Sequence, residues 1–209
     1  MEINKSIAPK KFDFRTVKDI SLNQLDQHYQ LYKNYVNQFN EINSKSRSAS
    51  DYPNSNTTFS PMRSLKKGET YALDGVKLHE LYFENITNSS CCASGEILAF
   101  INRDFLNYNN FIDYIKSAAL AMRGWVVVTI DPLTDSIQII GQDSHDDGAI
   151  WLSYPLLVLD VYEHAYMIDF GIDRKAYINA FIKNINWDVV NNRLKQYLRM
   201  KVAEAYRFI

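Results

Sequence analysis

The stretch from Tyr154 to Tyr166 places two titratable side chains in an unexpected setting. Its sequence is YPLLVLDVYEHAY, in which the apolar, strand-like run from Leu156 to Val161 contains Asp160, and His164 follows four residues later. Burying a carboxylate without a partner is costly, so Asp160 requires one. The candidates are a cationic side chain, a hydrogen-bond network or a metal ion.

The chain has four histidines, and three of them lie in apolar or aromatic surroundings. His28 falls on the apolar stripe of a predicted helix, His79 lies within GVKLHELYF, and His164 follows Asp160. One such histidine is more often a hydrogen-bonded core residue than a ligand. Three imidazoles and one carboxylate, however, form a mixed donor set that suits zinc, iron or manganese, of which zinc is redox-inert. Spacing alone does not choose among these metals.

The remaining histidine and the cysteines are weaker candidates. His145 lies in DSHDDG, whose composition is typical of a solvated turn, and we expect it there rather than at a metal. Cys91 and Cys92 are adjacent in a serine-rich segment, whereas a disulfide framework needs separated pairs. Adjacent thiolates rarely bind one structural zinc ion, so a metal role for them is disfavoured.

Two helices are predicted in the first half of the chain. Ser21 is a predicted N-cap with Gln24 as its capping-box partner. Apolar residues then recur at three- and four-residue steps, which predicts one helix face: Leu25, His28, Tyr29, Tyr32, Tyr35, Val36 and Phe39. A polar, turn-rich loop follows at 43–63, and a second helix is predicted over about 64–86. Two long helices joined by one loop predict a helical hairpin.

The second half combines helices with a small sheet. Helices are predicted near 96–104 and 108–122. Two β-branched runs, Trp125 to Ile130 and Ser136 to Ile140, predict a β-hairpin, and Leu156 to Val161 is the third strand. Further helices are predicted around 174–184 and 187–205.

The fold class is therefore α+β, with two domains. An N-terminal long helical hairpin occupies residues 1–91, and a C-terminal α/β domain with a three-stranded antiparallel sheet occupies residues 92–209. The boundary falls in the turn-rich segment NSSCCASG at 88–95.

Composition bounds the class of protein. The chain has 209 residues, of which 46% are hydrophobic and 22% charged, as in soluble globular proteins with a substantial core. The formal net charge of −1 gives no electrostatic argument for a nucleic-acid or membrane partner. The sequence starts without the apolar core of a signal peptide and contains no apolar run of about 18 residues. We therefore expect no membrane span and a cytoplasmic location.

The segment DVYEHAY, at 160–166, resembles the signature DVWEHAY of the iron/manganese superoxide dismutase family. Other segments resemble family motifs in the same order, so that the resemblance covers about residues 10–200. These are His28 and Tyr35 on the first helix, LHELY at 78–82, INRDF at 101–105, Gly124-Trp125, Gln142-Asp143, YINAF at 177–181 and NWDVV at 186–190.

The resemblance implies a metal centre between the two domains, with His28, His79, Asp160 and His164 as ligands. It implies a superoxide dismutase that converts superoxide to dioxygen and hydrogen peroxide, with one manganese or iron ion per subunit. On this interpretation Asp160 tolerates burial because a cation neutralises it.

The resemblance also implies roles for three residues around the metal. Gln142 hydrogen-bonds the metal-bound water, and Tyr35 continues this network toward the substrate channel. Glu163 reaches a ligand histidine of a second subunit, which implies a homodimer. Manganese-type members carry the glutamine after the second strand, as here, whereas iron-type members carry it where this chain has Gly75. This difference favours manganese over iron. Trp125, Phe83 and Tyr162 are expected to form an aromatic wall, and Arg174 to lie near the entrance.

The chain also departs from the family pattern. The spacing of His28 and Tyr35 is one residue shorter than in most members, and a gapless register would put Gln27 at the ligand position. We favour His28, because glutamine is a poor ligand here. Tyr32 replaces a histidine beside the ligands, and Met167 replaces the tyrosine that pairs with it across the dimer. The alternative function is thus a dismutase-fold metal-binding dimer with little or no activity, acting as a binding or scaffold protein.

Overall fold

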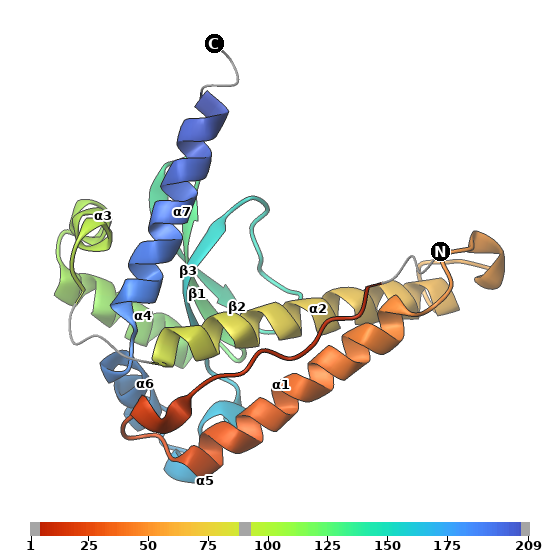
Figure 1. Cartoon of the computed structure of the whole chain (residues 1–209), viewed down its shortest axis with the longest axis horizontal. Helices are drawn as coiled ribbons and strands as arrows, with labels where there is room; N and C mark the ends of the chain where they lie inside the picture. Colours follow the sequence, from red (N-terminus) through yellow and green to blue (C-terminus); the bar gives the residue numbers. More distant parts are fainter. Residues whose placement is uncertain (1–4, 88–92, 206–209) are drawn as a thin grey trace.

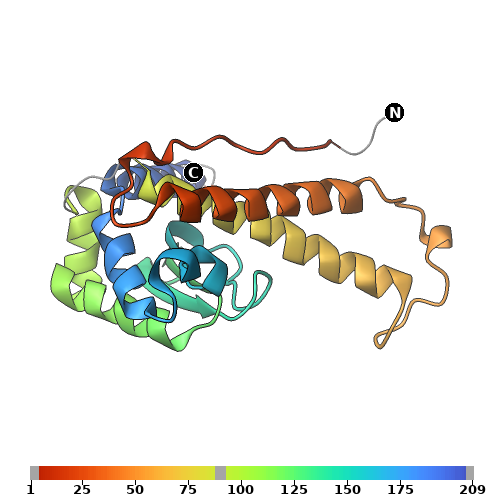
Figure 2. The same ribbon diagram turned by 90° about the horizontal axis from the view of Figure 1, so that it is seen from below.

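The structure of the protein is a computed structural model that describes residues 5–87 and 93–205 (Figure 1). Helix α1, Leu22–Asn43, and helix α2, Pro61–Ile86, form a long hairpin whose tip extends away from the rest of the molecule (Figures 1 and 2). The loop between them contains one 3-10 turn, Ala49–Asp51. The predicted helical hairpin is confirmed.

The two hairpin helices begin at capping residues. The Ser21 hydroxyl accepts a hydrogen bond from the Gln24 amide, as predicted for the N-cap of α1. The Gln24 side chain does not complete a capping box; it is fully buried and donates to the backbone carbonyl of His164. Helix α2 begins three residues before the predicted start, because Ser60 caps it and Pro61 occupies its first position, where proline needs no amide partner.

In the C-terminal part, helices come before and after a three-stranded sheet along the chain. Helices α3, Glu96–Phe105, and α4, Tyr108–Ala121, precede it, and α6, Arg174–Lys183, and α7, Trp187–Ala205, follow it. The predicted α+β class is confirmed. Two short elements were not predicted, the 3-10 turn Glu163–Ala165 and helix α5, Met167–Phe170. Elements of three or four residues are too short to show a periodic pattern.

The sheet has the order β2-β1-β3, and both strand pairs are antiparallel. Its strands are β1, Trp125–Asp131; β2, Ser136–Gln142; and β3, Tyr154–Asp160. Trp125, the first residue of β1, pairs with Gln142 on one side and with Asp160 on the other. The start of β1 and the ends of β2 and β3 therefore meet at one end of the sheet, the end that faces the functional site.

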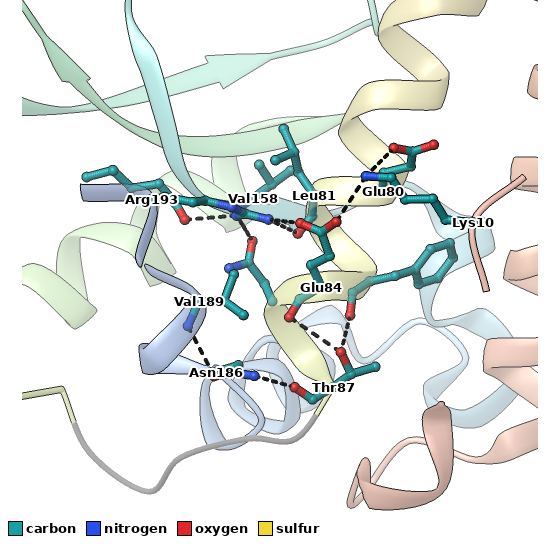
Figure 3. A network of polar contacts seen from close by, with 12 residues as sticks. Lys10, Glu80, Leu81, Glu84, Thr87, Val158, Asn186, Val189 and Arg193 are labelled. Atoms are coloured by element: carbon teal, nitrogen blue, oxygen red, sulfur yellow. Dashed lines mark hydrogen bonds and ion pairs between the residues drawn. The ribbon is translucent and has the colours of Figure 1, made fainter. Parts of the chain in front are cut away.

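A buried polar network fixes α2 against β3 and α7 (Figure 3). Arg193 of α7 is 7% exposed and donates to Glu84 and to the Asn85 side chain, both on α2, and to the backbone carbonyl of Leu156 on β3. The Asn85 side chain also accepts from the amide of Val158. These bonds hold the second hairpin helix in a fixed register on the strand that ends at the functional site.

An N-terminal segment, residues 5–17, runs along the hairpin (Figure 2). Lys10 is its main polar anchor: the Lys10 amide donates to the Tyr32 hydroxyl, and the Lys10 ammonium pairs with Glu80 and Glu84. Phe12 and Phe14 pack on the ring of Phe83 at centroid distances of 5.1 and 5.2 Å. The segment thus contacts both α1 and α2.

Two sequence predictions fall outside the described residues. Cys91 and Cys92 lie there, and so does most of the predicted domain boundary at 88–95. Within the described ranges, none of the helices has both the length and the apolarity needed to cross a membrane.

Candidate metal centre

Four side chains from four different elements converge at the end of the sheet. His28 comes from α1, His79 from α2, Asp160 is the last residue of β3, and His164 lies in the 3-10 turn that follows. One potential ligand atom from each lies within 4.8 Å of the others. The side chains of His28, His79 and Asp160 are fully buried, whereas that of His164 is 28% exposed. The cluster is therefore closed except on the side of His164.

The three imidazoles face one carboxylate oxygen. Asp160 Oδ2 lies 3.1 Å from His28 Nε2, 3.1 Å from His164 Nε2 and 3.7 Å from His79 Nε2. The other oxygen, Oδ1, accepts the backbone amide of Tyr162 at 2.9 Å. His79 Nε2 is buried and has no hydrogen-bond partner. A buried nitrogen without a partner, directed at a carboxylate among two further imidazoles, fits a metal ligand better than a satisfied core histidine.

Protonation of the cluster also suits metal binding. His79 Nδ1 donates to the carbonyl oxygen of Gly75 at 2.6 Å, which leaves Nε2 with its lone pair toward Asp160. Burial lowers the pKa of His79 well below its ordinary value and lowers the pKa of His28 as well. Burial opposes ionisation of Asp160, but His164 and His28 outweigh it and lower the pKa of that carboxyl. Neutral imidazoles and an ionised carboxylate are the ligand forms that a divalent or trivalent ion requires.

The shortened spacing on α1 still brings a histidine to the cluster. His28 is a member of it, whereas the Gln27 side chain donates to Asn23 on the exposed side of the helix. Tyr35 also reaches the site, with its ring 5.3 Å from that of His79. The structure thus places His28, rather than Gln27, among the candidate ligands.

Aromatic rings enclose the cluster as expected. Phe83 packs on His28 with 5.0 Å between ring centroids, Trp125 packs on His79 at 5.0 Å, and Tyr162 stacks on His164 at 5.1 Å. Trp125 and Phe83 are fully buried, while Tyr162 is half-buried at the open side. This wall lowers the local polarity and keeps bulk water from the three inner ligands.

His145 is buried, and the prediction that it lies in a solvated turn is wrong. It is 1% exposed, Nδ1 accepts the indole N–H of Trp125 at 2.9 Å, and Nε2 lies 2.8 Å from the Tyr35 hydroxyl. The loop after β2 folds back over the sheet end, which needs Gly148: this residue has φ +75°, and a Cβ there would lie 2.6 Å from the Gly141 carbonyl oxygen. Composition identified the turn but could not give its direction.

Gln142 makes its side-chain hydrogen bond within its own loop. Its amide nitrogen donates to the Asp147 carbonyl oxygen at 2.5 Å, and its Oε1 is buried without a partner. His145, not Gln142, joins Trp125 to Tyr35. In the sequence, Gly75 was the one signal of this arrangement. A Cβ at this position would lie 3.1 Å from the Tyr35 ring and 3.4 Å from the His145 ring, so a larger residue would crowd both. The missing side chain on α2 leaves the space that these two rings occupy.

The protonation state of His145 follows from its partners. Because the Trp125 indole can only donate, His145 Nδ1 carries no proton; the neutral ring has its proton on Nε2 and donates it to the Tyr35 oxygen. Burial lowers the pKa of His145 to about 4, which keeps it neutral near pH 7. Burial and, next, the Tyr71 hydroxyl raise the pKa of Tyr35, so the phenol stays protonated.

The two replaced positions and Glu163 lie beside the cluster. The Tyr32 hydroxyl accepts from the Lys10 amide and donates to Glu80 at 2.9 Å, so it serves the N-terminal segment rather than the cluster. Met167 is 46% exposed. The Glu163 side chain is 61% exposed and lies 3.5 Å from Arg174, whose guanidinium also donates to Tyr166 and to the Met122 carbonyl.

A buried three-histidine, one-aspartate cluster between a helical hairpin and a three-stranded α/β unit defines a mononuclear metalloprotein. Residues 93–193 match the family model described as iron/manganese superoxide dismutases, C-terminal domain. The chain is 37% identical to the superoxide dismutase [Fe] of Aquifex pyrophilus over 197 residues, 92% of each chain. It is 31% identical to the superoxide dismutase [Mn] of Haloarcula marismortui over 191 residues, 88% of this chain and 91% of the relative. The chain belongs to the iron/manganese superoxide dismutase family.

Proposed function

We propose that this protein is a superoxide dismutase whose single manganese or iron ion is held by His28, His79, Asp160 and His164. The observation that carries the proposal is the convergence of these four side chains, with the buried His79 Nε2 left without a hydrogen-bond partner. When bound, the metal supplies a one-electron couple, so that one superoxide is oxidised to dioxygen and a second, with two protons, is reduced to hydrogen peroxide.

The chain's own residues control access and proton supply. Substrate approaches from the side of His164, where the cluster is open, past Tyr35 and Tyr162. Tyr35 holds its hydroxyl proton beside His79 and receives a hydrogen bond from His145. We propose that His145 takes the positioning role that the resemblance assigned to Gln142. Arg174 adds positive charge near the open side and favours a small anion.

We also propose the identity of the metal, a homodimer and a cytoplasmic location. Gly75 stands where iron-type members carry glutamine, which supports manganese. The relatives include iron and manganese enzymes alike, so elemental analysis decides between the two metals.

A homodimer is supported by the exposed Glu163 and Met167 beside His164. The net charge of −1 gives no support for a nucleic acid or an anionic membrane as a partner, and a cytoplasmic location is a proposal. The complete cluster and the relatives' names favour the enzyme over a scaffold protein.

The test combines elemental analysis with a superoxide-consumption assay on the same purified protein. We expect nearly one manganese or iron ion per chain and rapid consumption. His79→Ala should lose both metal and activity. His145→Ala is the matched control, because it removes a buried histidine from the same region without removing a ligand, and it should retain the metal. Metal binding without superoxide consumption in the unmodified protein would refute the dismutase proposal.

A further inference from the structure

Tyr71 covers the His145 ring from the solvent side. Its ring packs on the His145 ring with 4.6 Å between centroids, and it lies 6.0 Å from the Tyr35 ring. His145 also contacts Tyr35 at 4.8 Å and Tyr162 at 5.3 Å. Although His145 is only 1% exposed, Tyr71 is 37% exposed. Tyr71 therefore forms part of the outer surface where His145 forms the inner layer.

The position of Tyr71 follows from the periodicity of α2. Tyr71, Gly75 and His79 are spaced four residues apart, so they lie along one face of the helix. His79 joins the metal cluster, and Gly75 leaves the space occupied by the rings of Tyr35 and His145. Tyr71, one turn before the glycine, covers this space from the solvent side. A smaller side chain at 71 would remove this cover and expose the His145 ring to solvent and small solutes.

We infer that Tyr71 is a positioning residue that holds His145 between Trp125 and Tyr35 and restricts the access of anions and water to the metal centre. This inference deepens the proposed dismutase function and rests on it for the role of the anion. The contact with His145 is made by the aromatic ring, whereas the Tyr71 hydroxyl acts on Tyr35, so the two effects of Tyr71 can be separated. Tyr71→Phe should therefore keep His145 in position, whereas Tyr71→Ala should not.

The first readout is acrylamide quenching of Trp125 fluorescence in the full-length protein as purified. Trp125 is fully buried beneath His145, whereas Trp151 is 94% exposed, so all variants carry Trp151→Phe to remove its signal. Trp187 is 2% exposed and contributes a constant background. We expect Tyr71→Ala to increase quenching several-fold and Tyr71→Phe to match the parent. Tyr114→Ala, at a 57% exposed tyrosine on α4, is the matched control and should also match the parent.

The second readout is the association rate of azide, a small anion that ligates iron and manganese, followed by stopped-flow absorbance. Tyr71→Ala should raise this rate several-fold, with Tyr71→Phe unchanged. Parent-like quenching and azide rates in Tyr71→Ala would overturn the inference, as would equal effects of alanine and phenylalanine. If Tyr71→Ala fails to fold by circular dichroism, Tyr71→Val, whose smaller side chain also removes the cover over His145, must show the same increases. Because quenching needs no superoxide, it decides on Tyr71 even if the dismutase assay fails.

Discussion

At the scale of single residues, the site depends on which side chain occupies the space between Trp125 and Tyr35. A glutamine and a histidine three positions apart compete for this place in the sequence, and the structure gives it to His145. The Gln142 amide is instead used within its own loop, on the Asp147 carbonyl. A neutral imidazole satisfies both neighbours, because it accepts from the Trp125 indole at one nitrogen and donates to the Tyr35 oxygen at the other.

Substitution of the two residues should separate their roles. We expect His145→Ala to lower the rate of superoxide consumption at least tenfold and stability by about 1–3 kcal/mol, because the indole N–H of Trp125 is left buried without a partner. Gln142→Ala should change the rate less than threefold. Pulse radiolysis on metal-matched samples measures both. An equal loss of activity in Gln142→Ala would restore the role first predicted for that residue.

At the scale of elements, α2 serves both as the helix that carries His79 and as the wall behind His145. Gly75 is required because two rings fill the volume that its side chain would occupy. Gly68, on the same helix, meets only the flexible end of Ile42, with 3.2 Å between the added Cβ and Cδ1. The same substitution should therefore have opposite effects at these two positions.

We predict that Gly75→Ala lowers stability by about 1–3 kcal/mol through overpacking and reduces superoxide turnover. Gly68→Ala should be neutral or stabilising by up to about 1 kcal/mol, because alanine is the better helix former. Thermal unfolding and activity assays on the two variants test this. A Gly75→Ala protein with parental stability and turnover would show that the rings of Tyr35 and His145 can move aside.

The contact between α2 and α7 predicts an acid-sensitive part of stability. Burial raises the pKa of Glu84, but Arg193 and Lys10 outweigh it and lower that pKa below the ordinary 4.5. The stabilising effect of the ionised Glu84 carboxylate is thus fully present above pH 4.5 and is lost as pH falls through the lower folded-state pKa. Glu84→Gln should cost about 1–3 kcal/mol at pH 7, because Arg193 is left buried without its carboxylate.

Urea unfolding of the metal-free parent and Glu84→Gln proteins from pH 7 down to about 3.5 measures the difference in stability between them. This difference should shrink at the acid end. Glu41→Gln is the control, because the exposed pair of Glu41 with Lys45 should contribute at most a few tenths of a kcal/mol. A difference between Glu84→Gln and the parent that does not vary with pH would contradict the assignment.

At the scale of the whole molecule, the open side of the centre adjoins an exposed apolar surface. Met167 and Ile168 on α5 are 46% and 48% exposed, and Glu163 points outward beside them. Contiguous exposed apolar residues around a charged group are typical of an interface. A second copy of the chain on this surface would lie beside His164 and narrow the open side of the centre.

We predict that light scattering gives twice the chain mass of 24.3 kDa. Met167→Asp should shift the protein toward monomer and lower metal retention, because a buried charge in an interface is costly. Leu133→Asp, at a 93% exposed leucine in the turn between β1 and β2, should remain a dimer. A monomeric parent protein at micromolar concentration would refute the dimer.

The sequence by itself determined the long helices, the strands and the identities of the candidate ligands. Helical periodicity, the cap at Ser21 and β-branched runs gave both hairpins, because these signals are local. Residue type grouped three histidines with Asp160, because a buried carboxylate needs a partner, and the ordered family motifs then implied these four as ligands.

Only the tertiary structure decided which polar side chains face one another. The loop after β2 turns inward and brings His145 to Trp125, while Gln24 ties α1 to the His164 segment instead of capping its own helix. Tyr32 likewise bonds to the N-terminal segment rather than to the cluster. Such contacts join residues far apart in sequence, and their geometry depends on how whole elements pack, which neither composition nor spacing encodes locally.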